Sequence, residues 1–167
     1  MTSMEAYSTV RTGTYLERLA AAAGLTLALV LLRLPFRHTV RATRLATQAG
    51  RRLLAPARAE ALVGAVRHTA RWWPGRAACM ETSLGAVLAA ALLGRRLTWC
   101  IGARFSPPPV EHHAWAELPD HGPVGEYTVA GWHYLTGMTI PGRRARIHQP
   151  PQAVVAYECP TPRRSEQ

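Results

Sequence analysis

The chain has 167 residues, 48% of them hydrophobic, and its mean hydropathy is near zero. This composition excludes a disordered chain, and the length fits one domain that buries a substantial core. The net charge is +10 and the sequence contains no lysine, so every fixed side-chain cation is an arginine. Such a surface suits contact with carboxylates, phosphates or anionic lipid.

The first fifty residues are predicted to be mainly helical. The uncharged run LAAAAGLTLALVLL, at Leu19–Leu32, is shorter than the roughly 20 residues that span a membrane. A helix is predicted over Tyr15–Gly50, with a break at Pro35. We expect the apolar run to be buried. The alternative is a helix lying on a membrane surface with four arginines near anionic headgroups, namely Arg33, Arg37, Arg41 and Arg44.

Two further helices are predicted in the middle of the chain. Pro56 suits the first turn of one helix, which Pro74 and Gly75 end. Trp72 and Trp73, near its end, could line a peptide groove, but we expect them to pack in the core. The next helix has apolar residues on one face at helical spacing, at Leu84, Val87, Leu88, Ala91 and Leu92.

The pattern then changes to a period of two, which indicates strands. Strands are predicted over 97–104, His112–Leu118 and Val124–Ala130, with a turn at Pro119–Gly122. A last strand is predicted at Ala153–Tyr157. Helices followed by an antiparallel sheet make the fold class α+β.

Cys79 lies in the first turn of its predicted helix, where unpaired N–H groups and the helix dipole favour a thiolate. A thiolate enzyme also needs an imidazole to protonate its leaving group. His112 and His113 are the candidates, and because neighbours on a strand point to opposite faces, only one can face the site. A cysteine or histidine in such a place can equally be structural.

The third role is a carboxylate that orients the imidazole. If Pro119 and Val124 close the hairpin as a facing pair, Glu126 lies opposite Glu117, on the face that carries His113. A slip of one residue would reverse this arrangement, so Glu117 and Asp120 remain alternatives. No metal site is expected, because Cys79, Cys100 and Cys159 lack paired spacing and adjacent histidines on a strand cannot bind one ion.

Four segments together resemble a known family. They are CMETSL at Cys79–Leu84, TWCIGAR at Thr98–Arg104, HAWAE at His113–Glu117 and GPVGE at Gly122–Glu126. This set, within Leu32–Glu126, resembles the lasso peptide leader peptidase, the stand-alone protease half of a split system in the transglutaminase-like cysteine-protease superfamily. The resemblance implies a transglutaminase-like or papain-like core, with Cys79 as nucleophile, His113 as base and acid, and Glu126 as the third member.

The resemblance also implies the reaction and its partners. Such a protein removes the leader from a ribosomally made lasso precursor peptide, with a small leader-binding protein and a lasso cyclase as partners and no cofactor. We expect an N-terminal helical region at 1–55, facing a partner or a membrane, and the protease domain at 56–167. Three cysteines without framework spacing, and no secretory signal at the N-terminus, predict a cytoplasmic protein, with membrane association as an alternative.

Two other functions stay open. One is a non-catalytic basic adaptor that binds a membrane surface or a partner peptide, suggested by the charge and the apolar N-terminal helix. Nucleic acid is not an expected partner, because the arginines follow no recognition-helix pattern. The other is a transglutaminase-type acyltransferase, in which an amine replaces water.

Overall fold

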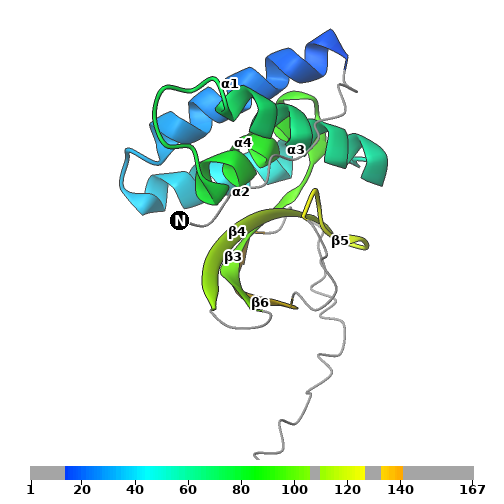
Figure 1. Cartoon of the computed structure of the whole chain (residues 1–167). Coiled ribbons are helices and arrows are strands. Elements are labelled where there is room, and N and C mark those ends of the chain that lie inside the picture. Colours follow the sequence, from blue (N-terminus) through cyan, green and yellow to red (C-terminus); the bar gives the residue numbers. More distant parts are fainter. Residues whose placement is uncertain (1–13, 106–109, 127–132, 141–167) are drawn as a thin grey trace, which may run out of the picture.

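The structure is a computed structural model that describes residues 14–105, 110–126 and 133–140. Its helices are α1 (Tyr15–Leu31), α2 (Phe36–Ala49), α3 (Pro56–Ala70) and α4 (Cys79–Leu92). Its strands are β1 (Arg52–Leu53), β2 (Arg95–Arg96), β3 (Thr98–Phe105), β4 (Glu111–Leu118), β5 (Gly122–Pro123) and β6 (His133–Ile140). The helices lie on one side and the curved antiparallel sheet on the other, which confirms the α+β class (Figure 1).

Helix α4 lies at the centre of the helical layer, with α1, α2 and α3 packed around it (Figure 1). Every residue from Ser83 to Ala90 is buried, so α4 is covered on all sides rather than on one face. Leu92 lies beyond this covered segment and is 55% exposed. A Cβ atom added to Gly24 of α1 would lie 2.7 Å from the Ala89 nitrogen, so glycine permits the close crossing of α1 and α4.

The predicted break at Pro35 is confirmed, because α1 ends at Leu31 and α2 begins at Phe36. Helix α2 buries three threonines spaced four residues apart, Thr39, Thr43 and Thr47. Each threonine hydroxyl donates a hydrogen bond to a backbone carbonyl, at 2.7–3.0 Å. Satisfied in this way, the polar side chains can lie in the interior without the cost of an unpaired donor.

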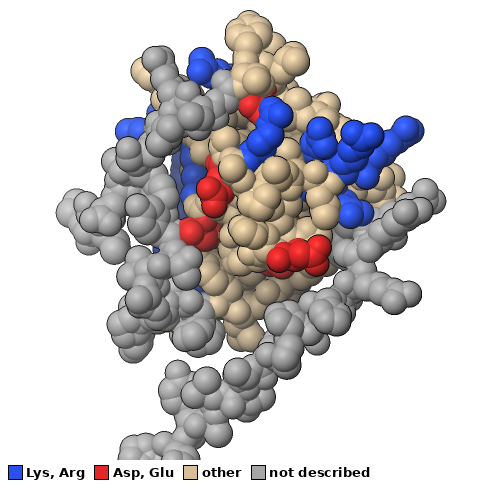
Figure 2. Space-filling view, turned by 90° about the vertical axis from the view of Figure 1, so that its right-hand side faces the viewer, with Lys and Arg blue, Asp and Glu red and all other residues tan. Residues whose placement is uncertain are grey.

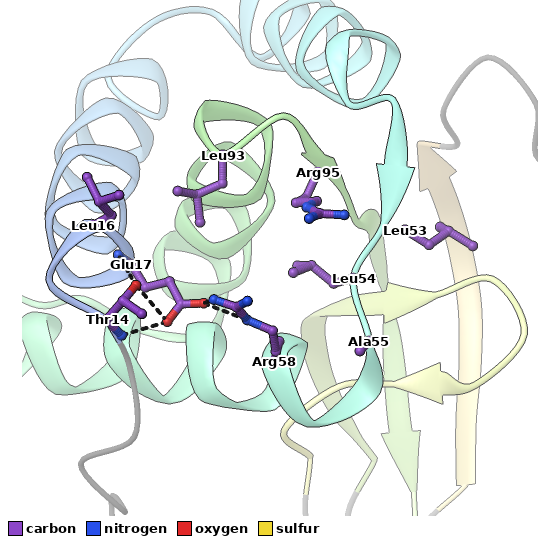
Figure 3. A pocket seen from close by; sticks show the side chains of 9 residues that line it. All are labelled: Thr14, Leu16, Glu17, Leu53, Leu54, Ala55, Arg58, Leu93 and Arg95. Carbon is purple, nitrogen blue, oxygen red and sulfur yellow. Dashed lines mark hydrogen bonds and ion pairs between the residues drawn. The ribbon is translucent and has the colours of Figure 1, made fainter.

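Helix α1 begins with a capping box, in which Glu17 and Thr14 exchange hydrogen bonds (Figure 3). The second oxygen of the Glu17 carboxylate accepts a hydrogen bond from Arg58 of α3 at 2.5 Å. A pocket of about 400 Å³ lies beside this pair, lined also by Leu93 at the end of α4 and by Arg95 of β2 (Figure 3).

The inner and outer faces of α1 differ. Ala21, Leu25 and Ala28 are buried, as expected, whereas Leu19 is 50% and Val30 56% exposed. Full burial of this helix was therefore a wrong prediction, because α4 and α3 cover only one of its faces. Among the helices described, none has both the length and the apolar character needed to cross a bilayer.

The positive charge is unevenly distributed. On the face in Figure 2, arginine side chains gather in groups, while carboxylates form a few separate patches. Along the chain, the segment 18–59 contains no acidic residue. It contains eight arginines: Arg18, Arg33, Arg37, Arg41, Arg44, Arg51, Arg52 and Arg58.

The larger sheet has the strand order β5-β4-β3-β6. The predicted strands at 97–104 and His112–Leu118 are confirmed as β3 and β4, whereas β6 was not predicted. Trp99 of β3 is fully buried and its indole N–H donates to the Ser83 hydroxyl of α4 at 3.0 Å, which joins the sheet to the helical layer. The strand predicted at Ala153–Tyr157 lies outside the described residues.

The hairpin after β4 differs from its predicted form. Glu117 lies opposite Pro123, not opposite Glu126, and β5 ends at Pro123. The chain then bends at Val124 and at Gly125, which has a φ of +67°. A regular strand over Val124–Glu126 was therefore a wrong prediction, because the left-handed conformation of Gly125 breaks the extended chain. The rest of that predicted strand lies outside the described residues.

The two tryptophans between α3 and α4 do not pack in the core. Trp72 is 80% exposed and Trp73 43%. The prediction of core packing was wrong because α3 ends at Ala70, so both tryptophans lie in the turn that follows the buried part of the helix.

Candidate active site

Cys79 is the first residue of α4, as its sequence position predicts. The residue before it, Ala78, donates its backbone N–H to the Glu81 carboxylate at 2.9 Å, which fixes the start of the helix. A hydrogen bond with His113 is the main influence that lowers the pKa of the Cys79 thiol below its ordinary value. Burial opposes this effect, whereas the backbone N–H groups of Ala114 and Met80 reinforce it.

His113 of β4 connects the sulfur to a carboxylate. Its Nε2 atom lies 2.9 Å from Oε2 of Glu126, which leaves Nδ1 to face Cys79. Burial alone lowers the pKa of His113, but its hydrogen bonds with Cys79 and Glu126 outweigh that effect and raise the pKa to about 9. The adjacent His112 is exposed. Of the two candidate histidines, the structure therefore brings His113 into the site.

Glu126 binds a different partner with each carboxylate oxygen. Oε2 contacts His113, and Oε1 accepts a hydrogen bond from Nη2 of Arg67 at 2.5 Å. Only 7% of the Glu126 side chain is exposed. Burial alone would raise the pKa of this carboxyl, but the hydrogen bond with His113 and the charge of Arg67 hold it below its ordinary value. Glu126 is therefore ionised beside the imidazole at neutral pH.

Arg67 of α3 also holds the backbone at the bend. Its Nη1 atom donates a hydrogen bond to the carbonyl of Gly125, next to the carboxylate that Nη2 binds. No described strand pairs with the chain beyond Pro123, and the last backbone bond there runs from Val124 N–H to Ala116 at 2.9 Å. Arg67, which belongs to helix α3, thus holds Glu126 beside His113, whereas strand pairing in the hairpin was predicted to do so.

Aromatic side chains surround the imidazole. The His113 ring stacks on Trp115, with centroids 6.1 Å apart and planes inclined by 14°. Tyr134 of β6 lies 6.2 Å from His113, and its hydroxyl donates to Oε2 of Glu126 at 3.5 Å. Such packing restricts the ring to the orientation in which one nitrogen faces the sulfur and the other the carboxylate.

The alternative acid, Glu117, has other partners. Its carboxylate accepts hydrogen bonds from the Trp115 indole at 3.1 Å and from the Cys100 thiol at 3.4 Å. Burial, together with the Glu117 charge, raises the pKa of Cys100 to about 12. Cys100 therefore stays protonated and unreactive. The other alternative, Asp120, is exposed in the turn after β4.

Reasoning from the sequence missed two residues of the site, Arg67 and Tyr134. The spacing of residues in α3 could have indicated Arg67. It lies one helical turn after Val63 and next to Val66, both buried, and a cation beside a buried face indicates a buried partner. No sequence pattern indicated Tyr134, because the segment around β6 shows no regular alternation. In the described part of the chain, no group of three or more His, Cys, Asp or Glu side chains is placed to hold a metal ion.

Comparison with known families matches residues 21–139 to the transglutaminase-like superfamily. The chain belongs to this superfamily. The matched span runs from α1 into β6 and includes Cys79, His113 and Glu126. Searches of curated proteins and of solved structures found no match. Membership supports an activity of the cysteine-protease or acyltransferase type.

The expected division into residues 1–55 and 56–167 stays a prediction. Helices α1 and α2 pack on α4, and the buried residues of α1 belong to the same apolar core as those of α3 and α4.

Proposed function

We propose that this protein is a cysteine peptidase that removes the leader peptide from a lasso precursor during its maturation. The observation that carries the proposal is the chain of contacts from Cys79 through His113 to Glu126, at the start of a helix and on the neighbouring sheet. The four sequence segments that resemble the lasso leader peptidases support the choice of substrate. The superfamily membership supports the class of chemistry.

The first half of the reaction forms a thioester. The Cys79 thiolate attacks the carbonyl carbon of the last leader residue, and the negative charge passes to the carbonyl oxygen. We expect the backbone N–H of Cys79, which is at the helix start, to donate to that oxygen. His113 gives its proton to the core-peptide nitrogen, the C–N bond breaks, and the core leaves with a free amine.

The second half releases the leader. Neutral His113 removes a proton from water, and the resulting hydroxide attacks the thioester carbon. The C–S bond breaks, so that the leader leaves as a carboxylic acid, which then loses its proton to the solvent, and the Cys79 thiolate and the His113 imidazolium are restored. Glu126 stays ionised throughout and stabilises the imidazolium.

Arg67 is a positioning residue in this proposal. It acts through Glu126 and through the Gly125 carbonyl. With Arg67 cationic, Glu126 anionic, His113 cationic and Cys79 anionic, the buried group carries no net charge. A neutral group avoids the cost of a buried uncompensated charge.

The partners and location follow from the same proposal. The lasso precursor is the substrate, a small leader-binding protein presents it, and a lasso cyclase uses the freed core. Because the nucleophile must stay reduced, we place the reaction in the cytoplasm. Adding the leader-binding protein at limiting precursor should raise the cleavage rate, and an unchanged rate would contradict delegated leader recognition.

The experiment that tests this function separates hydrolysis from acyl transfer. The precursor is incubated with the protein and with an excess of a primary amine, and the products are identified by mass spectrometry. Free leader with a terminal carboxylate, together with intact core peptide, is the expected result. A leader–amine adduct as the main product would instead identify an acyltransferase, and an uncut precursor would contradict both.

A further inference from the structure

The outer face of α1 carries a row of exposed apolar side chains. Its members, which we call the α1 stripe, are Leu19 (50% exposed), Leu27 (44%) and Val30 (56%). At 100° per residue these three positions fall within about 80° of the helix circumference, and at 1.5 Å per residue they extend over about 16.5 Å. Single exposed leucines are common on protein surfaces, but a row of this length marks a contact surface.

No charged side chain interrupts the α1 stripe. The acidic residue of α1, Glu17, is 6% exposed and binds Arg58 in the pocket at the other side of the helix start (Figure 3). Arg18 lies about 100° around the helix from the nearest member of the stripe, Leu19. Past the end of α1, Leu34 is 47% exposed, and Phe36, whose ring centroid lies 6.4 Å from that of Trp99, is 46% exposed.

Arginines adjoin the apolar surface at this end. Arg33 and Arg37 are exposed on either side of Leu34 and Phe36. On α2, Arg41 and Arg44 are exposed, and Leu45, which follows Arg44, is 67% exposed. These arginines belong to the 42-residue segment 18–59, which contains no acid. An apolar row beside uncompensated guanidinium groups is complementary to a surface of acyl chains with anionic phosphates.

We infer that the α1 stripe, with the turn that follows it, binds the surface of an anionic lipid membrane. The helix lies along the interface, its leucines enter the acyl region, and the guanidinium groups remain at the level of the phosphates. A second copy of this chain fits less well, because a symmetric pair would bring two sets of arginines together.

The test is flotation of the full chain with vesicles of phosphatidylcholine alone or with about one third phosphatidylglycerol. Leu19→Gln/Leu27→Gln, which we call the stripe variant, removes two of the three side chains of the stripe without changing the charge. A matched control, Val110→Gln/Leu135→Gln, which we call the sheet variant, removes one apolar side chain just before β4 and one on β6, 65% and 56% exposed. Arg33→Gln/Arg37→Gln tests the charge contribution, and protection of the buried Cys100 thiol from alkylation shows that each variant is folded.

Wild type and the sheet variant should bind the anionic vesicles equally, and the stripe variant about tenfold more weakly. The arginine variant should bind more weakly, and binding should fall as salt is raised. Equal binding by the stripe variant would overturn the inference, since a +10 chain could then bind by charge alone. The inference would also be overturned if wild type bound vesicles of pure phosphatidylcholine as strongly as anionic vesicles. A dimer in sedimentation that is lost only in the stripe variant would overturn it too.

Discussion

Replacing Arg67 by glutamine removes the cation that holds Glu126. The guanidinium now donates one hydrogen bond to Oε1 of Glu126 and another to the Gly125 carbonyl. Without it, the buried carboxylate keeps His113 and Tyr134 as its partners among the described residues, and no described strand holds the bend. The pKa of Glu126 should rise, because the charge that lowers it is gone. The uncompensated carboxylate, where ionised, should raise the pKa of His113 further.

The magnitude follows from burial. Removing one partner of a buried ion pair costs about 3–5 kcal/mol, and because 29% of the Arg67 side chain is exposed we expect the lower end, about 3 kcal/mol of unfolding free energy. Groups that orient a metal-binding histidine typically affect activity by about 10–100-fold. A similar loss in single-turnover cleavage corresponds to about 1.4–2.8 kcal/mol of barrier.

The assay combines precursor cleavage with the rate of Cys79 alkylation by iodoacetamide across pH, followed by mass spectrometry at that cysteine. Arg58→Gln is the matched control, because it removes another arginine of α3 that pairs with a glutamate at 2.5 Å, away from the site. It should lower stability while keeping cleavage and the alkylation profile. Arg67→Lys should restore the pH profile but only part of the rate, because one ammonium replaces a two-pronged contact. A wild-type rate and profile in Arg67→Gln would refute the reasoning.

Three further predictions concern the same site. Glu126→Gln should slow single-turnover cleavage about 100-fold while Glu117→Gln changes it little, and the reverse order would reassign the acid. His113→Ala should abolish cleavage and His112→Ala should retain it, since the exposed ring of His112 lies outside the site; a greater loss in His112→Ala would contradict the assignment. In wild type, the cleavage rate should fall as pH rises through about 9, because His113 then lacks the proton for the leaving amine. A rate still rising at pH 10 would contradict that proton transfer.

Much of the fold could be predicted because local signals were strong. Pro35 and Pro56 mark a helix break and a helix start, and Gly94 follows the last helix at a φ of +66°. The alternation of apolar and polar residues in the segments that form β3 and β4 predicted that His113 and His112 point to opposite faces of the sheet. The three proposed catalytic residues are brought together by the structure, while their roles stay predictions.

The prediction that Glu126 lies on the same face as His113 was based on a wrong register of the hairpin after β4. The predicted hairpin paired it with Glu117, whereas it reaches His113 through a left-handed bend at Gly125 and a contact with Arg67. Such a long-range contact leaves no periodic signal, because it joins two residues 59 positions apart. The outer face of α1 was also misjudged, since an all-apolar helix does not reveal which side its neighbours cover.

The most direct test of the central claim is to look for the covalent intermediate on Cys79. Wild type is mixed with the lasso precursor, quenched in acid within the first turnover, and analysed by mass spectrometry beside Cys79→Ala and Cys100→Ala. We predict a leader thioester on Cys79 in wild type and Cys100→Ala, with released core peptide bearing a free amine. Cys79→Ala should show neither adduct nor cleavage. Cleavage that persists in Cys79→Ala would contradict the account.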